Sequence, residues 1–329
     1  MIKNIKIRKI ILLIIISFLT FPVLADENEF KIEKIIDFLA FGTGSTTGTY
    51  YPLGNAFAHI WTQKSKKINV MTHSTNGSYE NIELLRNHEI NLAIAQSDTV
   101  TAALMGTGKF EGRPYKDLKV LMALYPEVIQ IVVASDTSGI QKIEDLKGHI
   151  INVGPANSGN ALTAIELLET LNIHKDDYKM VNMSYDEAIQ AMEKQECDAT
   201  IIIAGVPTKA VIEMKKRIPI RILNIEPQIA LDVTGKLTYL VSFPLSDDIY
   251  GLGKSVNTFT VMALLISNSD LKEDLGYDLL KMIFENIEYL KVIHERARDI
   301  SIENALRSFN MNYLHNGAAK FFNEVNQNK

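Results

Sequence analysis

FLAFGTGSTTGTYYPLG, residues 38–54, is the stretch of sequence that decides the fold. It begins with an apolar run, Phe38 to Phe41, which has the length and content of a buried strand. A loop rich in glycine and hydroxyl side chains follows, and from Pro52 onward apolar residues recur at helical spacing. Such a strand, loop and helix place loop amides, hydroxyls and a positive helix end together, so this stretch predicts an anion-binding site.

Three other interpretations of the loop compete with an anion site. Its glycines, at 42, 44 and 48, do not have the G-x-G-x-x-G spacing of dinucleotide sites, and the next expected strand, 68–72, ends without a carboxylate. A Walker loop requires Gly-Lys-Ser/Thr, but Gly48 is followed by Thr49. The sequence therefore disfavours both nucleotide motifs, and an ordinary tight turn between strand and helix remains the alternative to a ligand-binding loop.

The same order of apolar strand, polar loop and helix recurs along the chain, which indicates an α/β fold. Strands are expected at 68–72, 92–95, 149–153, 179–183, 199–204 and 220–223, and helices at 79–87, 161–171, 185–194, 209–216, 288–298 and 317–325. Ser78 is expected to cap the helix at 79–87, and Ser184 with Glu187 has the spacing of a capping box. The Ile- and Ala-rich run 199–204 predicts a strand buried on both faces.

Three further strand-like runs indicate how the lobes are connected. Two of them, 120–124 and 128–134, lie on either side of Tyr125-Pro126-Glu127, and the third, 258–267, follows more than a hundred residues later. This arrangement suits a chain that crosses to a second lobe and later returns. The region 239–255 is expected to be irregular.

Residues 42–61, GTGSTTGTYYPLGNAFAHIW, resemble the opening of the TAXI group of solute-binding proteins from TRAP (tripartite ATP-independent periplasmic) transporters. Further similar segments follow in order: NGSYEN at 76–81, QSD at 96–98, LYPE at 124–127, NVGP at 152–155, SGNA at 158–161, AGVPT at 204–208 and LHNGA at 314–318. The sequence departs from the family pattern at Ser45 and Thr47, where glycine is usual, and at Asn316, where proline is common. The first two departures bear on the shape of the loop and on the choice of ligand.

The resemblance implies a two-lobed fold like that of type II periplasmic binding proteins, with a ligand cleft between the lobes. Residues 26–127 would form the first part of lobe 1, 128–262 lobe 2, and 263–329 the C-terminal helices of lobe 1. It also implies an extracytoplasmic receptor that delivers a small carboxylate to TRAP membrane permease subunits, separate or fused, for uptake driven by an ion gradient. The implied ligands are glutamate- or glutamine-like amino acids, dicarboxylates and 2-oxoacids.

Residues 1–25 have the pattern of a secretory signal peptide that is removed. Basic residues, Lys3 to Lys9, precede the apolar run 10–19 and a small-residue cleavage site, Val23-Leu24-Ala25. Without this segment the chain has 30 Lys and Arg against 39 Asp and Glu, a net charge of −9. We therefore expect a periplasmic monomer that does not bind nucleic acid or anionic lipid. Cys197, the sole cysteine, precedes an expected strand and predicts a buried thiol.

Motifs for catalysis are missing from the sequence. Neither G-x-S-x-G nor H-E-x-x-H occurs, and the seven histidines are scattered without the spacing of metal ligands. We therefore expect a binding protein without enzymatic activity, cofactor or metal. A binding module that serves a membrane sensor, and an exported enzyme on the same fold, are the alternatives.

The candidate site follows from the rule that ligands of α/β sheets bind beyond the carboxyl ends of the strands. Five loops are expected there: 42–51, 73–78 and 96–99 from lobe 1, and 154–160 and 205–208 from lobe 2. The predicted ligand-binding residues are Gly44, Ser45, Thr46, Thr49, Tyr50, Asn76, Ser78, Gln96, Ser97, Asp98, Pro155, Ser158, Asn160, Gly205, Val206 and Thr208. Helix or loop capping is the alternative role for the hydroxyls and amides, and Asp98 is either a cap or the partner of a ligand ammonium. Candidate cations for the ligand charge are Arg86, Arg113 and Arg221.

Overall fold

The structure, a computed structural model, describes residues 37–136 and 139–327, and the expected signal peptide lies outside them. Its strands are β1 (Asp37–Gly42), β2 (Ile68–His73), β3 (Leu92–Gln96), β4 (Leu118–Ala134), β5 (Ile150–Asn152), β6 (Lys179–Val181), β7 (Ala199–Ala204), β8 (Ile220–Ile222), β9 (Val241–Leu245) and β10 (Val256–Asn268). Its α-helices are α1 (Tyr50–Lys64), α2 (Ser78–Arg86), α3 (Ser97–Met105), α4 (Gly159–Thr170), α5 (Tyr185–Glu193), α6 (Lys209–Arg217), α7 (Pro227–Lys236), α8 (Glu273–Glu285), α9 (Ile287–Ile293) and α10 (Asn316–Gln327). None of these helices is both long and apolar enough to cross a membrane.

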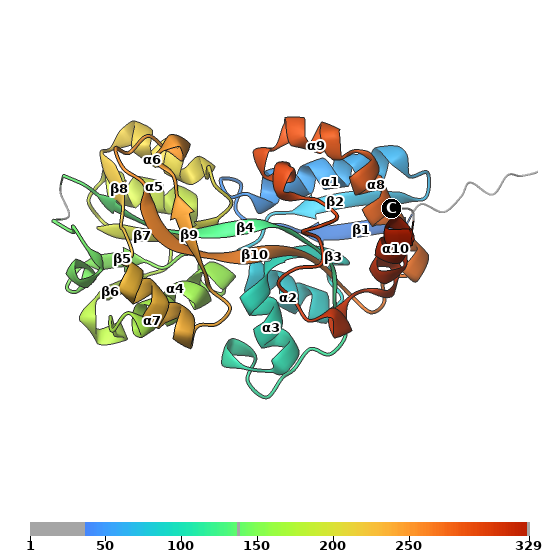
Figure 1. Ribbon diagram of the computed structural model, residues 1–329, viewed down its shortest axis with the longest axis horizontal. Coiled ribbons are helices and arrows are strands. Elements are labelled where there is room, and N and C mark those ends of the chain that lie inside the picture. The colour runs from blue at the N-terminus through green and yellow to red at the C-terminus, as the bar shows by residue number, and fades with distance from the viewer. Residues whose placement is uncertain (1–36, 137–138, 328–329) are drawn as a thin grey trace, which may run out of the picture. The chain divides into compact units, whose positions relative to one another are not determined.

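The described strands form one mixed sheet in the order β2-β1-β3-β10-β4-β7-β5-β6, and β8 and β9 pair with β4 and β10. In Figure 1 the two long antiparallel strands β4 and β10 run through the middle of this sheet. We call lobe 1 the part with β1–β3, α1–α3 and α8–α10, and lobe 2 the part with β5–β8 and α4–α7. In chain order, β4 leads from the first of these parts to the second, and β10 leads back.

β4 is one strand of 17 residues, whereas the sequence predicted two strands interrupted at Pro126. Pro126 is accommodated because it lies beside a β-bulge: the register with β10 shifts between Met262 and Leu264. Pairing of β4 with β7 begins only at Val128, so the missing N–H of Pro126 breaks no bond of that ladder. Proline within a sheet is confined to such positions, where no ladder hydrogen bond is lost.

Apolar side chains cover both faces of the sheet in each lobe. In lobe 2, Ile201 and Ile203 of β7 belong to one buried cluster, and Ile202 and Ala204 belong to the cluster on the other face. The prediction that this strand is buried on both faces is thus confirmed. Trp61 of α1 lies in the core of lobe 1, as does the apolar residue Phe41 of β1.

Several local predictions differ from the structure. Ser78 is the first residue of α2 and not its cap, because Gly77 holds the cap position and the Ser78 hydroxyl accepts a hydrogen bond from the Gln96 N–H at 3.0 Å. The helix expected at 288–298 ends at Ile293 and continues as a short 3-10 turn. The region 239–255 contains β9, which pairs with β10. The capping box of Ser184 and Glu187 is confirmed.

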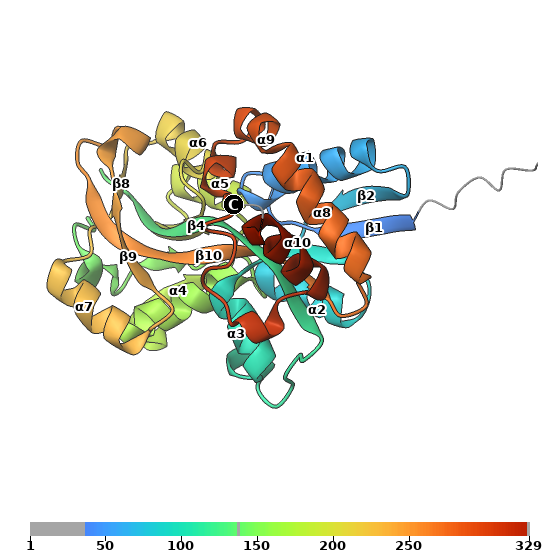
Figure 2. The same ribbon diagram turned by 45° about the vertical axis from the view of Figure 1, so that its right-hand side comes forward.

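Gly317 allows α10 to pack closely on α8, and Figure 2 shows these two helices next to each other. A Cβ on Gly317 would contact the carbonyl oxygen of Glu273 and would lie 2.6 Å from the backbone nitrogen of Tyr277. Because both contacts are with backbone, no side-chain rotation can relieve them.

We therefore expect Gly317→Ala to lower the free energy of unfolding by about 1–3 kcal/mol, the usual effect of overpacking. Urea denaturation followed by circular dichroism would measure this change. Gly235→Ala in α7 is the matched control, because an added Cβ there meets no atom within 4 Å. Equal urea midpoints for the two variants would contradict the close packing.

Candidate ligand-binding site

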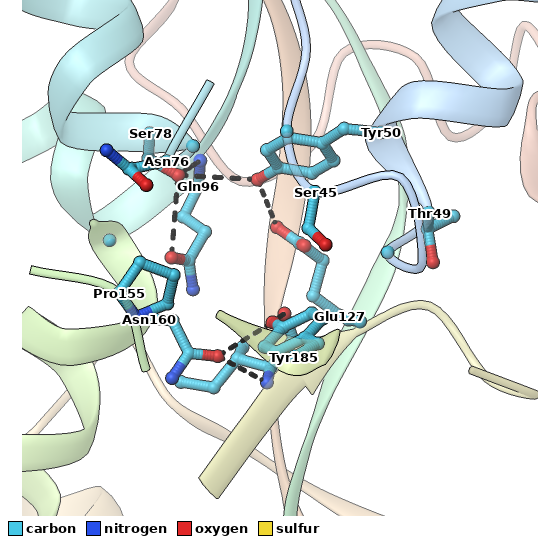
Figure 3. A pocket seen from close by; sticks show the side chains of 16 residues that line it. Ser45, Thr49, Tyr50, Asn76, Ser78, Gln96, Glu127, Pro155, Asn160 and Tyr185 are labelled. Atoms are coloured by element: carbon cyan, nitrogen blue, oxygen red, sulfur yellow. Dashed lines mark hydrogen bonds between the residues drawn. The ribbon is translucent and has the colours of Figure 1, made fainter. Parts of the chain in front are cut away.

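A small cavity lies between the lobes, where the loops after β1, β2 and β5 meet the carboxyl ends of β3 and β7 (Figure 3). Its volume of about 50 Å³ suits a small molecule, since a single water needs roughly 10–15 Å³ on the same measure. The predicted site residues that line it are Gly44, Ser45, Thr49, Tyr50, Asn76, Ser78, Gln96, Pro155 and Asn160. The other lining residues are Gly48, Gly77, Glu127, Gly159, Tyr185, Ile203 and Ala204. The expected convergence of loops from both lobes is therefore present, while ligand contact by these residues stays a prediction.

Two helices begin at the cavity without a capping side chain. Neither Thr49, the N-cap of α1, nor Gly77, the N-cap of α2, makes a side-chain capping hydrogen bond. The first N–H groups of a helix have no partner within the helix, and the helix dipole makes this end positive. The α4 helix differs, because the Ser158 hydroxyl accepts a hydrogen bond from the Ala161 N–H at 3.0 Å. The starts of α1 and α2 are thus suited to hold a carboxylate.

Gln96 supplies a further donor. Only 2% of the residue is exposed, and its carbonyl oxygen lies 3.4 Å from the Ser78 hydroxyl. Among the described residues its side-chain nitrogen, Nε2, has no hydrogen-bond partner although it is buried. In Figure 3 the side chain extends into the cavity. A buried N–H without a partner is costly, so this group favours a ligand with an acceptor oxygen.

Glu127 of β4 lines the cavity, although it was not among the residues that the sequence predicted for the site. It is only 2% exposed, and its carboxylate oxygen Oε2 accepts a hydrogen bond of 2.8 Å from the Tyr50 hydroxyl. Burial raises the pKa of Glu127 well above its usual range, and the hydrogen bond from Tyr50 offsets part of this effect. The signal in the sequence was the only carboxylate of a mostly apolar stretch, Leu118–Ala134.

Tyr185 is a second lining residue that was not predicted from the sequence. Its hydroxyl lies 2.8 Å from the Asn160 side-chain oxygen and 3.0 Å from the Ile203 carbonyl oxygen. Burial raises the pKa of Tyr185, as it does for Tyr50, so both hydroxyls are neutral donors at physiological pH. Together they contribute apolar rings to the wall and polar groups to the hydrogen-bond network.

Asn160 lines the cavity, but its side chain is fully used within lobe 2. The amide nitrogen donates to the carbonyl oxygens of Val153 and Ile201 at 2.7 and 2.9 Å. The amide oxygen accepts from the Ile203 N–H at 2.7 Å and faces the Tyr185 hydroxyl. This residue therefore joins the start of α4 to strand β7.

Other predicted site residues are not among those that line the cavity. Ser158 caps α4, and the Ser97 hydroxyl accepts a hydrogen bond from the Met262 N–H at 3.2 Å. The Thr208 hydroxyl donates to the Gly205 carbonyl oxygen at 2.9 Å, and Val206 belongs to a buried apolar cluster. The hydroxyls of Ser158, Ser97 and Thr208 are thus hydrogen-bonded within the protein.

Three predicted residues lie beside the cavity and not in it, and two of them join the lobes. The Asp98 carboxylate accepts a hydrogen bond from the Thr163 hydroxyl of lobe 2. The Gly205 carbonyl oxygen accepts one from the Thr49 hydroxyl at 3.2 Å. Thr46 lies at an adjacent hollow on the surface. The structure therefore has the lobes in contact around the cavity.

Among the residues that the structure describes, no Lys, Arg or His lines the cavity. The candidate cations are engaged elsewhere: Arg86 and Arg113 both contact the Glu83 carboxylate, and Arg221 hydrogen-bonds to Gln141. Within the described ranges, no group of three or more His, Cys, Asp or Glu side chains is arranged to hold a metal. Cys197 is buried as predicted, and burial raises its thiol pKa to about 11.

Comparison with known proteins gives a family and a fold. The sequence matches the NMT1-like family over residues 41–325. A putative L-cystine ABC transporter protein from Listeria monocytogenes superimposes with a TM-score of 0.51 at 12% identity, covering 81% of this chain and 98% of that chain. The alkanesulfonate-binding protein SsuA from Xanthomonas axonopodis pv. citri, bound to MOPS, gives 0.50 at 15% identity, covering 89% and 80%. These similarities confirm the predicted α/β fold of periplasmic binding proteins.

Proposed function

This chain belongs to the NMT1-like family, and we propose that it is an extracytoplasmic solute receptor that binds a small metabolite carrying a carboxylate. The observation that carries this proposal is the composition of the cavity. Both lobes line it, α1 and α2 start at it without capping side chains, and the buried Gln96 nitrogen lacks a partner among the described residues. These donors match the acceptor oxygens of a carboxylate.

Ligand binding would act by stabilising contact between the lobes. A ligand that touches both lobes binds the closed form better than an open form, and it shifts the population by that difference in affinity. The lobes already make three hydrogen bonds around the cavity, from Thr49, Thr163 and Thr47, the last to the Asp186 carboxylate at 3.2 Å. A membrane partner would then recognise the closed arrangement of the two lobes.

For the partner we propose a TRAP permease, so that uptake is driven by an ion gradient. The support is the resemblance of residues 42–61 and the later segments to the TAXI group. An ABC transporter is the second candidate, because the Listeria protein of similar fold carries that name. Uptake into vesicles that contain the permease encoded beside this protein would distinguish the two. Loss of uptake on collapse of the ion gradient supports TRAP, and a requirement for ATP supports ABC.

We expect purified residues 26–329 to bind a carboxylate metabolite with a dissociation constant of roughly 1 µM, or about 8 kcal/mol. At a ligand concentration of about one hundred times this constant, binding would stabilise the folded protein by about 2.7 kcal/mol. A thermal-shift screen of amino acids, dicarboxylates and 2-oxoacids would detect that effect as a rise of several degrees. If no carboxylate in the screen stabilises the protein, that result would count against the receptor assignment. Turnover of a bound metabolite would favour an exported enzyme.

A further inference from the structure

We propose that Glu127 selects the ligand by pairing its carboxylate with a ligand ammonium group, so that the cargo is a small α-amino acid with an uncharged side chain. This inference rests on the proposed function, because it assumes that the cavity is the ligand site. It narrows the ligand class, since dicarboxylates and 2-oxoacids lack an ammonium group.

The charge of the lining is the first argument. Glu127 is the only Asp, Glu, Lys, Arg or His side chain among the described residues that line the cavity. A dicarboxylate would place two negative charges beside a buried acid, with no cation among the lining residues to balance them. Repulsion between charges is strong in a buried site because its dielectric constant is low. A zwitterion has one charge of each sign. Its ammonium group can pair with Glu127, and its carboxylate can accept hydrogen bonds from the starts of α1 and α2 and from Gln96.

The hydrogen-bond chain along one wall is the second argument. The Tyr50 hydroxyl lies 2.8 Å from the Glu127 carboxylate and 3.4 Å from the Ser78 hydroxyl. Ser78, the first residue of α2, lies in turn 3.4 Å from the Gln96 side-chain oxygen. The acceptor for an ammonium and the donors for a carboxylate are thus neighbours (Figure 3). An α-amino acid carries its two charged groups on one carbon, so both can be held at this wall.

Asp98, the other acid near the site, is less suited to this role. The structure places it outside the lining and gives its carboxylate the Thr163 hydroxyl of lobe 2 as partner. The part of the lining contributed by lobe 2 is largely apolar or neutral, with Pro155, Tyr185 and Ile203. An uncharged ligand side chain fits that surface, whereas a second carboxylate finds no cation there.

The protonation of Glu127 gives the inference a second readout. Burial raises the pKa of Glu127 in the free protein, and the groups that act on it are the Tyr50 hydroxyl and the charge of Asp98, with Tyr125 and Tyr185 as its other titratable neighbours. Below that raised pKa the free carboxyl is protonated, and pairing with an ammonium requires it to ionise. Binding would therefore release a proton, and affinity would rise by up to about tenfold per pH unit until the pH reaches the raised pKa, above which it levels off.

The test compares amino acids with analogues that lack the ammonium group. Pairs such as L-alanine and propionate, L-glutamine and 5-amino-5-oxopentanoate, and L-glutamate and glutarate are titrated calorimetrically into purified residues 26–329, after a thermal-shift survey of all twenty amino acids. We expect at least one amino acid with an uncharged side chain to bind. Its deaminated partner and L-glutamate should both bind with lower affinity. Titration in buffers of different ionisation enthalpy should show proton release for the amino acid.

The variant Glu127→Gln keeps the size of the side chain and an acceptor for Tyr50. The substitution should lower the affinity for the amino acid by about 100-fold, because it leaves the buried ligand ammonium without its charged partner. Glu111→Gln, at an exposed position outside the cavity, is the matched control and should bind as the parent does. If Glu127→Gln does not fold, the affinities of the parent protein for each ligand pair and its proton release on binding still test the inference.

Any of four outcomes would overturn the inference. If a deaminated acid binds as tightly as its amino acid, or if Glu127→Gln leaves the amino acid affinity unchanged, Glu127 does not select an ammonium, while the receptor assignment stands. Tightest binding of L-glutamate would contradict the uncharged side chain. If no member of any pair binds and no amino acid stabilises the protein, the proposed function fails as well.

Discussion

Gly159→Ala is expected to weaken ligand binding by roughly 10- to 100-fold while leaving the lobes folded, which corresponds to an overpacking cost of about 1–3 kcal/mol on the closed form alone. Gly159 is the first residue of α4 in lobe 2 and faces lobe 1 across the cavity. An added Cβ would lie 2.7 Å from the Ser78 Cβ and would contact the Gln96 side-chain oxygen. Both contacts exist only while the lobes are together.

We expect the free energy of unfolding of each lobe to be unchanged or slightly higher in this variant. Alanine is a better helix former than glycine, and Gly159 does not have the positive φ that would strain an alanine. The affinity measured for a protein falls by the fraction that is competent to bind, so a penalty on closure appears directly as weaker binding.

Two measurements would check this expectation. Calorimetric titration with the amino acid that gives the largest thermal shift reports the affinity, and small-angle X-ray scattering reports whether the variant stays open in its presence. Gly235→Ala, where an added Cβ meets no atom within 4 Å, is the control. Affinities of the two variants within twofold of each other would show that Gly159 does not limit closure.

Asn160→Ala should have the opposite profile, with a loss of about 2–4 kcal/mol in the free energy of unfolding. The Asn160 amide bonds to the Val153 and Ile201 carbonyl oxygens and to the Ile203 N–H, and it is only 5% exposed. Alanine would leave these backbone groups buried without partners. The loss falls on lobe 2 itself and does not depend on closure.

Urea denaturation followed by circular dichroism would measure this loss in the absence of ligand. Asn323→Ala is a suitable control, because Asn323 is exposed on α10. If Asn160→Ala and Asn323→Ala unfold at the same urea concentration, the amide network does not stabilise lobe 2. Gly159 and Asn160 are adjacent in sequence, so the pair of variants separates closure from folding at one place in the chain.

The sequence predicted most of the strands because each is a short apolar run that ends at a glycine or a polar loop. It failed at β4, where Pro126 and Glu127 interrupt the apolar pattern. The strand continues there because a bulge against β10 accommodates the proline, and that partner lies more than a hundred residues away. A pattern read within a short window contains no information about such a partner.

The candidate site was predicted in part for a similar reason. Four of the five expected loops contribute residues to the cavity lining, and the loop 205–208 contributes none. The sequence does not show whether a hydroxyl at the start of a helix caps that helix or points away. The Ser158 hydroxyl bonds to its own helix, whereas that of Ser78 accepts the Gln96 N–H. Glu127 was not predicted because its role depends on the Tyr50 hydroxyl, which comes from a distant part of the chain and donates a hydrogen bond to its carboxylate.

The paired strands β4 and β10 have a practical consequence for handling the protein. A single proteolytic cut in the turn at 251–254, which is exposed except at the half-buried Leu252, would divide the chain between these strands, leaving β4 in one fragment and β10 in the other. Their antiparallel ladder extends from Leu118 to Val128 on one side and from Thr260 to Asn268 on the other, so the two fragments would stay bound together. A nicked preparation should therefore elute from a sizing column as one particle, and the same turn is a suitable place for new termini in a circular permutant.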